Sequence, residues 1–150
     1  MRFVFVDRID KIEKNKYAKG IKAVSFEEGF LKSPNYGNGI FPPLLLMECA
    51  AQLASWLIMY SSDFKWMPLM AKMDKVSLLE NVKTGTTMSI EVNILSMNEE
   101  GALINADIFT FPGGKLIAKG ERCLCVFADL DEFADKEEMK ARFLDLYREA

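Results

Sequence analysis

The sequence contains no histidine among its 150 residues, so the side chain that most often transfers protons near neutral pH is missing. The residues of a zinc site are missing too, because the three cysteines form no C-x-x-C pair and no histidine can complete a ligand set. We therefore expect no metal and no cofactor. An odd number of cysteines without disulfide spacing favours a reduced, cytoplasmic compartment.

A strong net charge is also lacking, since 19 basic and 22 acidic residues give a net charge of -3. That balance provides no electrostatic footprint for nucleic acid. The N-terminus meets an acid after too short an apolar run for a secretory signal peptide. The apolar stretch Leu44 to Tyr60 is marginal in length for a membrane span and carries Glu48 and Gln52. We expect neither a nucleic acid nor a membrane as a partner.

Half of the residues are hydrophobic, which at this length predicts one domain, 1–150, with a core that needs no disulfide. The patterns predict an N-terminal hairpin of two strands at 4–13 and 17–24. A loop rich in glycine and proline is expected at 26–40, and a long helix at 42–59. Four further strands are expected to form an antiparallel meander, at 67–79, 86–96, 102–111 and 115–127. An amphipathic helical extension is expected at about 131–150.

The long helix opens after two prolines and is apolar nearly all round, apart from three polar residues on one face. Glu48, Gln52 and Ser55 stand at i, i+4 and i+7, which places them together. An ionised carboxylate without a partner is costly to bury, so it must become neutral, find donors or face a cavity. Glu48 is therefore the first candidate for function, and a buried structural acid is its alternative reading.

Three stretches carry a resemblance to a known family, namely FVDRI at 5–9, PPLLLMECAAQ at 42–52, and MDKV at 73–76 leading to VKTGT at 82–86. On these stretches the chain resembles the 3-hydroxyacyl-[acyl carrier protein] dehydratases of fatty acid synthesis, over residues 3–127. The resemblance implies an α+β hotdog fold, in which a bent antiparallel sheet wraps a long central helix. The C-terminal helix would be an addition to it.

In that family the helix acid works with a histidine in the preceding loop, and the two meet across a dimer interface. Glu48 stands at the position of the acid, and Gln52 at that of a glutamine one turn later. The two family histidines fall on Pro34 and Asn38, and the glycine whose N–H holds the thioester carbonyl falls on Pro43, which has no N–H. Base and donor each contribute at least about a hundredfold to the rate. The standard dehydratase mechanism is therefore not expected.

Three functions remain open. The first is the binding of acyl groups carried as thioesters by acyl carrier protein or coenzyme A, without standard dehydratase activity. The second is an acyl thioesterase in which Glu48 is the base or nucleophile and Gln52 or Ser55 orients water. The third is an unorthodox 3-hydroxyacyl thioester dehydratase in which Glu48 acts with Tyr36 or Asn38.

The expected catalytic residues are Glu48 and Gln52, and the expected substrate contacts are Asn38, Gly39, Phe41, Leu44 and Ser55. The expected partners are the acyl thioester and a second subunit. That subunit is a further copy in a homodimer or higher homo-oligomer, or an active hotdog protein in a heteromer.

Overall fold

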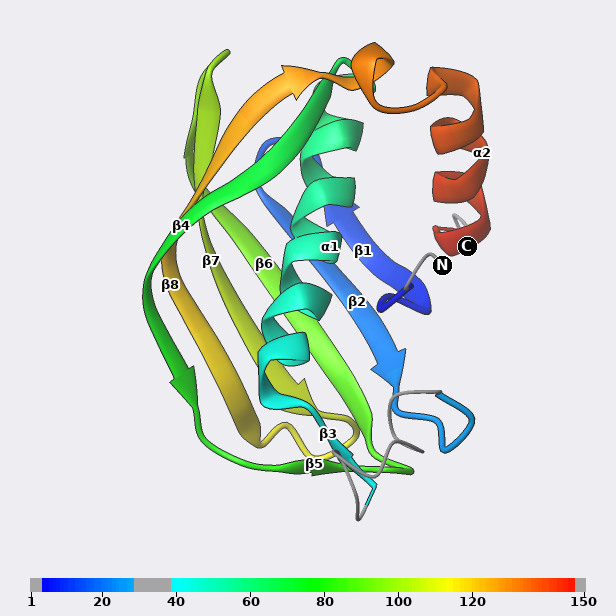
Figure 1. Cartoon of the computed structure of the whole chain (residues 1–150), viewed down its shortest axis with the longest axis vertical. Helices are drawn as coiled ribbons and strands as arrows, with labels where there is room; N and C mark the ends of the chain where they lie inside the picture. Colours follow the sequence, from blue (N-terminus) through cyan, green and yellow to red (C-terminus); the bar gives the residue numbers. More distant parts are fainter. Residues whose placement is uncertain (1–3, 29–38, 148–150) are drawn as a thin grey trace.

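One long helix lies in the concave face of a curved antiparallel sheet in the computed structural model, which describes residues 4–28 and 39–147 (Figure 1). The helix is α1 (Pro43–Ser61). The sheet has six strands, in the spatial order β1 (Arg8–Glu13), β2 (Tyr17–Ala23), β6 (Thr87–Met97), β7 (Gly101–Thr110), β8 (Leu116–Asp129) and β4 (Trp66–Leu78). A second sheet pairs β3 (Ile40–Phe41) with β5 (Val82–Lys83). The chain then forms η3 (Leu130–Glu132) and α2 (Lys136–Leu146).

This arrangement confirms the hotdog fold with an added C-terminal helix, and it corrects the order of the strands. The expected meander placed the strand at 67–79 beside the one at 86–96, but β6 pairs with β2, and β4 pairs with β8. The reason is the connection after β4, which passes through β5 at one end of the molecule before it enters the middle of the sheet. As a result β4, with 13 residues, is an edge strand.

The helix and the sheet fit together because their apolar faces match. Nine of the 19 side chains of α1 are buried, and the alternation in β7 places Ala102, Ile104, Ala106 and Ile108 on the inner face. Gly20 on β2 allows the helix to approach closely, since a Cβ there would lie 3.2 Å from Cδ1 of a leucine of α1.

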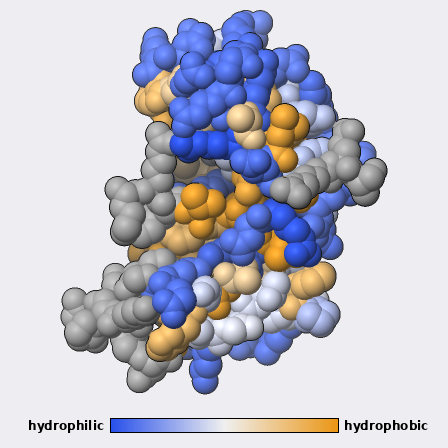
Figure 2. All heavy atoms as spheres, turned by 90° about the vertical axis from the view of Figure 1, so that its right-hand side faces the viewer, coloured by the Kyte–Doolittle hydropathy of each residue, from blue (hydrophilic) through white to orange (hydrophobic). Residues whose placement is uncertain are grey.

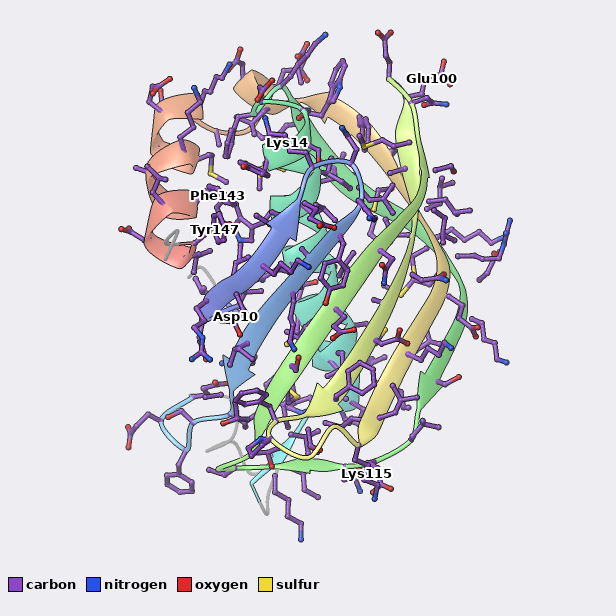
Figure 3. The ribbon with its side chains drawn as sticks, turned by 180° about the vertical axis from the view of Figure 1, so that it is seen from behind. Asp10, Lys14, Glu100, Lys115, Phe143 and Tyr147 are labelled. Carbon is purple, nitrogen blue, oxygen red and sulfur yellow. The ribbon has the colours of Figure 1, made fainter. Side chains whose placement is uncertain are left out.

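The C-terminal helix packs through one aromatic side chain. Phe143 is buried and stacks on Tyr60 near the end of α1, with ring centroids 4.9 Å apart, and Tyr147 lies next to it at 5.7 Å (Figure 3). The Asp135 side chain accepts a hydrogen bond from the backbone N–H of Glu138 at 2.8 Å and so caps the N-terminus of α2. Figure 2 shows that the outer surface of α2 is hydrophilic, as expected for an amphipathic helix.

Candidate functional site

The three polar residues of α1 share one face, as their spacing predicts, and this face lies beside the edge strand β4. Glu48 is exposed, whereas Gln52 and Ser55 are half-buried. The reading of Glu48 as a buried acid is therefore wrong for the single chain. The cause is geometric, because Glu48 lies where the helix faces the edge of the sheet and not its centre.

The carboxylate of Glu48 is held in place through Gln52. The backbone N–H of Phe5 donates to Oε1 of Gln52 at 2.8 Å, and Nε2 of Gln52 donates to Oε1 of Glu48 at 3.2 Å. Because a backbone N–H needs an acceptor, the first bond fixes the amide oxygen toward Phe5 and the amide nitrogen toward Glu48. The segment before β1 thus orients the glutamine, and the glutamine orients the acid.

A groove runs beside this face between α1 and the first residues of β4. Its volume is about 280 Å³, and its lining residues are Glu48, Ala51, Gln52, Ser55, Pro68, Leu69, Met70 and Cys125. The hydroxyl of Ser55 donates to the carbonyl oxygen of Ala51 at 2.8 Å. Its single proton is thereby used, so the Ser55 hydroxyl oxygen can only accept a hydrogen bond from a ligand in the groove. The site combines one oriented carboxylate with walls that are partly polar and partly apolar, which suits a ligand that has an apolar part and a polar end.

The thiols near the site are protected from ionisation. Burial raises the pKa of Cys125 in the groove wall to about 11, and burial raises the pKa of Cys49, beside Glu48 in the sequence, to about 12. A thiol needs to be ionised to act as a nucleophile or a metal ligand. Both cysteines are fully within the core, which supports the interpretation that they serve packing.

The structure does not bring the other expected contacts into the groove. Gly39 precedes β3 with a φ of 64°, and Phe41 is fully buried with its ring 6.0 Å from that of Phe5. Leu44 is 77% exposed and lies one turn before Glu48, at the open end of the helix. Asn38, like Pro34 and Tyr36, falls outside the residues that the structure describes.

Three groove residues were missed by sequence reasoning, namely Ala51, Pro68 and Leu69. The signal in the sequence was the alternation of Trp66, Pro68 and Met70 at the start of β4, which places their side chains on one face of the strand. That this face lies against α1 depends on the pairing of β4 with β8, which the sequence did not reveal.

A helix wrapped by a bent sheet, with a carboxylate-bearing groove on the exposed side of the helix, makes this a hotdog-fold protein. Residues 1–121 match the model of the FabA-like domain. The chain belongs to this FabA-like family. The matched region ends within β8, so η3 and α2 lie beyond it.

Curated relatives of similar length are dehydratases. The chain is 34% identical over 120 residues to the 3-hydroxyacyl-[acyl-carrier-protein] dehydratase FabZ of Caldicellulosiruptor saccharolyticus, which covers 79% of this chain and 84% of the relative. It is 31% identical over 120 residues to FabZ of Clostridioides difficile, covering 79% of this chain and 83% of the relative.

Solved structures share the fold at low sequence identity. The protein smu.793 from Streptococcus mutans, bound to acetyl CoA, superposes with a TM-score of 0.66 at 12% identity over 86% of this chain and 94% of the other. A hypothetical thioesterase from Streptococcus pneumoniae with coenzyme A gives a TM-score of 0.62 at 13% identity, over 81% and 85% of the two chains. The PaaI protein of Escherichia coli gives a TM-score of 0.62 at 11% sequence identity, over 79% of this chain and 81% of the other.

Proposed function

We propose that this protein binds acyl groups presented as thioesters on acyl carrier protein or coenzyme A, in fatty acid or polyketide-type synthesis, without the standard dehydratase reaction. The observation that carries the proposal is the groove beside α1, in which the oriented carboxylate of Glu48 stands next to apolar side chains such as Leu69 and Met70. Membership of the FabA-like family supports it, as do structural neighbours bound to acetyl CoA or to coenzyme A.

The argument against standard dehydration is chemical. Dehydration of a 3-hydroxyacyl thioester removes the proton next to the carbonyl and needs stabilisation of the resulting enolate oxygen. No histidine exists anywhere in the chain to act as the base. At the start of α1, Pro43 has no N–H to donate, and the N–H of Leu45 already donates to the carbonyl oxygen of Pro42 at 2.9 Å. An unorthodox dehydratase using Tyr36 or Asn38 ranks last.

A thioesterase is the second candidate, and the bond between Gln52 and Glu48 is the observation that favours it. An exposed carboxylate held by an amide donor can accept a proton from water that attacks a thioester. Gln52 is better placed than Ser55 to orient that water, because the Ser55 hydroxyl donates to the helix backbone. The backbone N–H of Leu44 in the first turn and the helix dipole would favour the developing oxyanion.

We also propose that the protein pairs with a second subunit through β4. This strand is a long sheet edge, and Leu69, Val76 and Leu78 on it are exposed in the single chain. An unpaired edge of this kind is a template for another strand. The partner is a second copy, or an active hotdog subunit that supplies the missing base. Native mass spectrometry of the purified protein, alone and after co-expression with such a subunit, distinguishes the two.

We place the protein in the cytoplasm. By length and composition α1 could cross a membrane, yet half of its most apolar 18-residue window is buried inside the fold. The three cysteines are free and buried, which suits a reducing compartment.

Mass spectrometry of intact thioesters tests the proposed function. Saturated and 3-hydroxyacyl thioesters, on carrier protein and on coenzyme A, are incubated with the wild type, with Glu48→Ala and with the matched surface variant Glu99→Ala. Intact thioesters together with a bound acyl chain in the native spectrum support binding. Release of free acid that Glu48→Ala abolishes and Glu99→Ala keeps would make the protein a thioesterase. Loss of water with the same dependence would overturn the proposal in favour of a dehydratase.

A further inference from the structure

A second hollow lies on the outer face of the sheet, which is the face that α1 does not cover. Its volume is about 260 Å³, and it is open to solvent. Figure 3 shows this face, with α1 behind the strands and Lys115 labelled just beyond the turn between β7 and β8. The lining comes from β2, β6, the end of β7 and that turn, and it includes Lys19, Ser89, Glu91, Phe109 and Phe111.

A hydroxyl group without a hydrogen-bond partner lines this hollow. Ser89 is 4% exposed, and its Oγ has no partner within residues 4–28 and 39–147, which the structure describes. The side chain points to the outer face, because its neighbours Met88 and Ile90 are fully buried on the inner one. Its cross-strand partners are Ile21 and Phe109, whose side chains cannot bond to a hydroxyl. Because a buried hydroxyl without a partner is costly, a ligand that supplies one is favoured.

Two opposite charges stand beside this hydroxyl. Glu91 follows Ser89 by two residues on β6, so it shares the outer face, and Lys19 is its cross-strand partner on β2. Nζ of Lys19 and Oε1 of Glu91 are 3.9 Å apart, which is too far for a hydrogen bond. Burial, and after it the negative charge of Glu91, raise the pKa of Tyr17 to about 12, so the nearby tyrosine stays neutral. The hollow therefore offers one cation and one anion.

Two aromatic side chains form the apolar part of the hollow. Phe109 is half-buried, and Phe111, just beyond the end of β7, is 42% exposed. A Cβ on Gly114, in the turn that follows, would meet no atom within 4 Å, so the space on that side is open. At about 30 Å³ for each group the size of a water molecule, the hollow takes roughly nine such groups. That is the size class of a free amino acid.

We propose that this hollow binds a free α-amino acid with an apolar side chain, such as leucine. The ammonium group of the ligand donates to the carboxylate of Glu91, and its carboxylate accepts from Lys19 and from the hydroxyl of Ser89. Its side chain lies against Phe109 and Phe111. The site is independent of the proposed function, because the sheet separates it from Glu48.

Isothermal titration calorimetry tests the ligand class with leucine, with isoamylamine, which lacks the carboxylate, and with isocaproate, which lacks the ammonium group. Leucine should bind, and each analogue should have a Kd at least roughly tenfold higher, because it loses one bond to a charged group. Equal affinity for leucine and either analogue, or no binding of leucine at millimolar concentration, would overturn the proposal.

Ser89→Ala separates a ligand-binding hydroxyl from a structural one. It should raise the Kd of leucine by about threefold to tenfold and leave the midpoint of urea denaturation unchanged or higher, because the free protein loses no hydrogen bond. A lower midpoint with an unchanged Kd would show that the hydroxyl serves the fold and would overturn the proposal.

Lys19→Met and Glu91→Gln should each raise the Kd of leucine by roughly tenfold or more. Lys119→Met is the matched control, since Lys119 lies on β8 outside the hollow and pairs with Glu121 at 3.9 Å, and its Kd should stay at that of the wild type. A Kd that neither Lys19→Met nor Glu91→Gln changes would place the ligand elsewhere and overturn the assignment.

Discussion

Gln52 links the N-terminal segment to the site through two hydrogen bonds. Two substitutions of Gln52 measure the contribution of each bond to stability. Gln52→Leu removes the acceptor of the Phe5 N–H and the donor to Glu48. Phe5 is 4% exposed, so water cannot easily replace that acceptor. A buried donor that loses its partner costs about 1–3 kcal/mol, whereas the bond to the exposed Glu48 contributes less. We expect the free energy of unfolding to fall by about 1–3 kcal/mol.

Gln52→Glu is the matched variant, because a carboxylate still accepts from Phe5 but cannot donate to Glu48. It also places a second negative charge near the first, which costs about 1 kcal/mol for exposed charges about 4 Å apart. We expect this variant to lose about 1 kcal/mol at pH 7 and less at pH 4, which is near the ordinary pKa of the glutamate side chain that the substitution introduces.

Urea denaturation at pH 7 and at pH 4 measures both free energies of unfolding, and native-state hydrogen exchange reads the Phe5 amide directly. Exchange at Phe5 should speed up in Gln52→Leu and stay slow in Gln52→Glu. The reasoning fails if the two variants lose the same free energy at both pH values, or if the Phe5 amide exchanges equally fast in both.

Three further outcomes follow from the packing. Gly39→Ala should lower the free energy of unfolding by about 1–3 kcal/mol by urea denaturation, because φ is 64° and the new Cβ would lie 2.8 Å from Oγ1 of Thr84. Phe143→Ala should cost about 3–5 kcal/mol, whereas Leu144→Ala on the exposed side of α2 should change stability by less than about 0.5 kcal/mol. Burial raises the pKa of Cys49 from 9.0 to about 12, so the folded state keeps a proton that the unfolded chain releases. The free energy of unfolding should therefore decrease as the pH rises from about 9 toward 12, and a pH series of Cys49→Ala should show a shallower decrease.

Much of the local structure could be predicted from the sequence. The prolines before Leu44 and the apolar pattern predicted a helix to about residue 59, and α1 ends at Ser61. The strand patterns predicted the N-terminal hairpin, which β1 and β2 form, and Asn15 between them adopts a φ of 63°. These features depend on neighbours within a few residues, where propensity and periodicity act.

The candidate site was predictable only in part. The spacing of Glu48, Gln52 and Ser55 placed them on one face, but nothing in it indicated whether that face would be covered. Phe5 is separated from Gln52 by 47 residues, so their hydrogen bond has no local signal. The opposite wall of the groove came from Pro68 and Met70, whose position depends on the pairing of β4 with β8.

The sequence by itself determined which groups are available: no histidine, one carboxylate on an apolar helix, and a proline where a backbone donor would be needed. Composition and short-range pattern are properties of the chain alone, so they exclude chemistry before any contact forms. Only the tertiary structure decided what those groups face. Strand pairing and the burial of the apolar side of α1 join residues that are distant in sequence, and they left Glu48 exposed beside a groove whose other wall includes Pro68 and Met70.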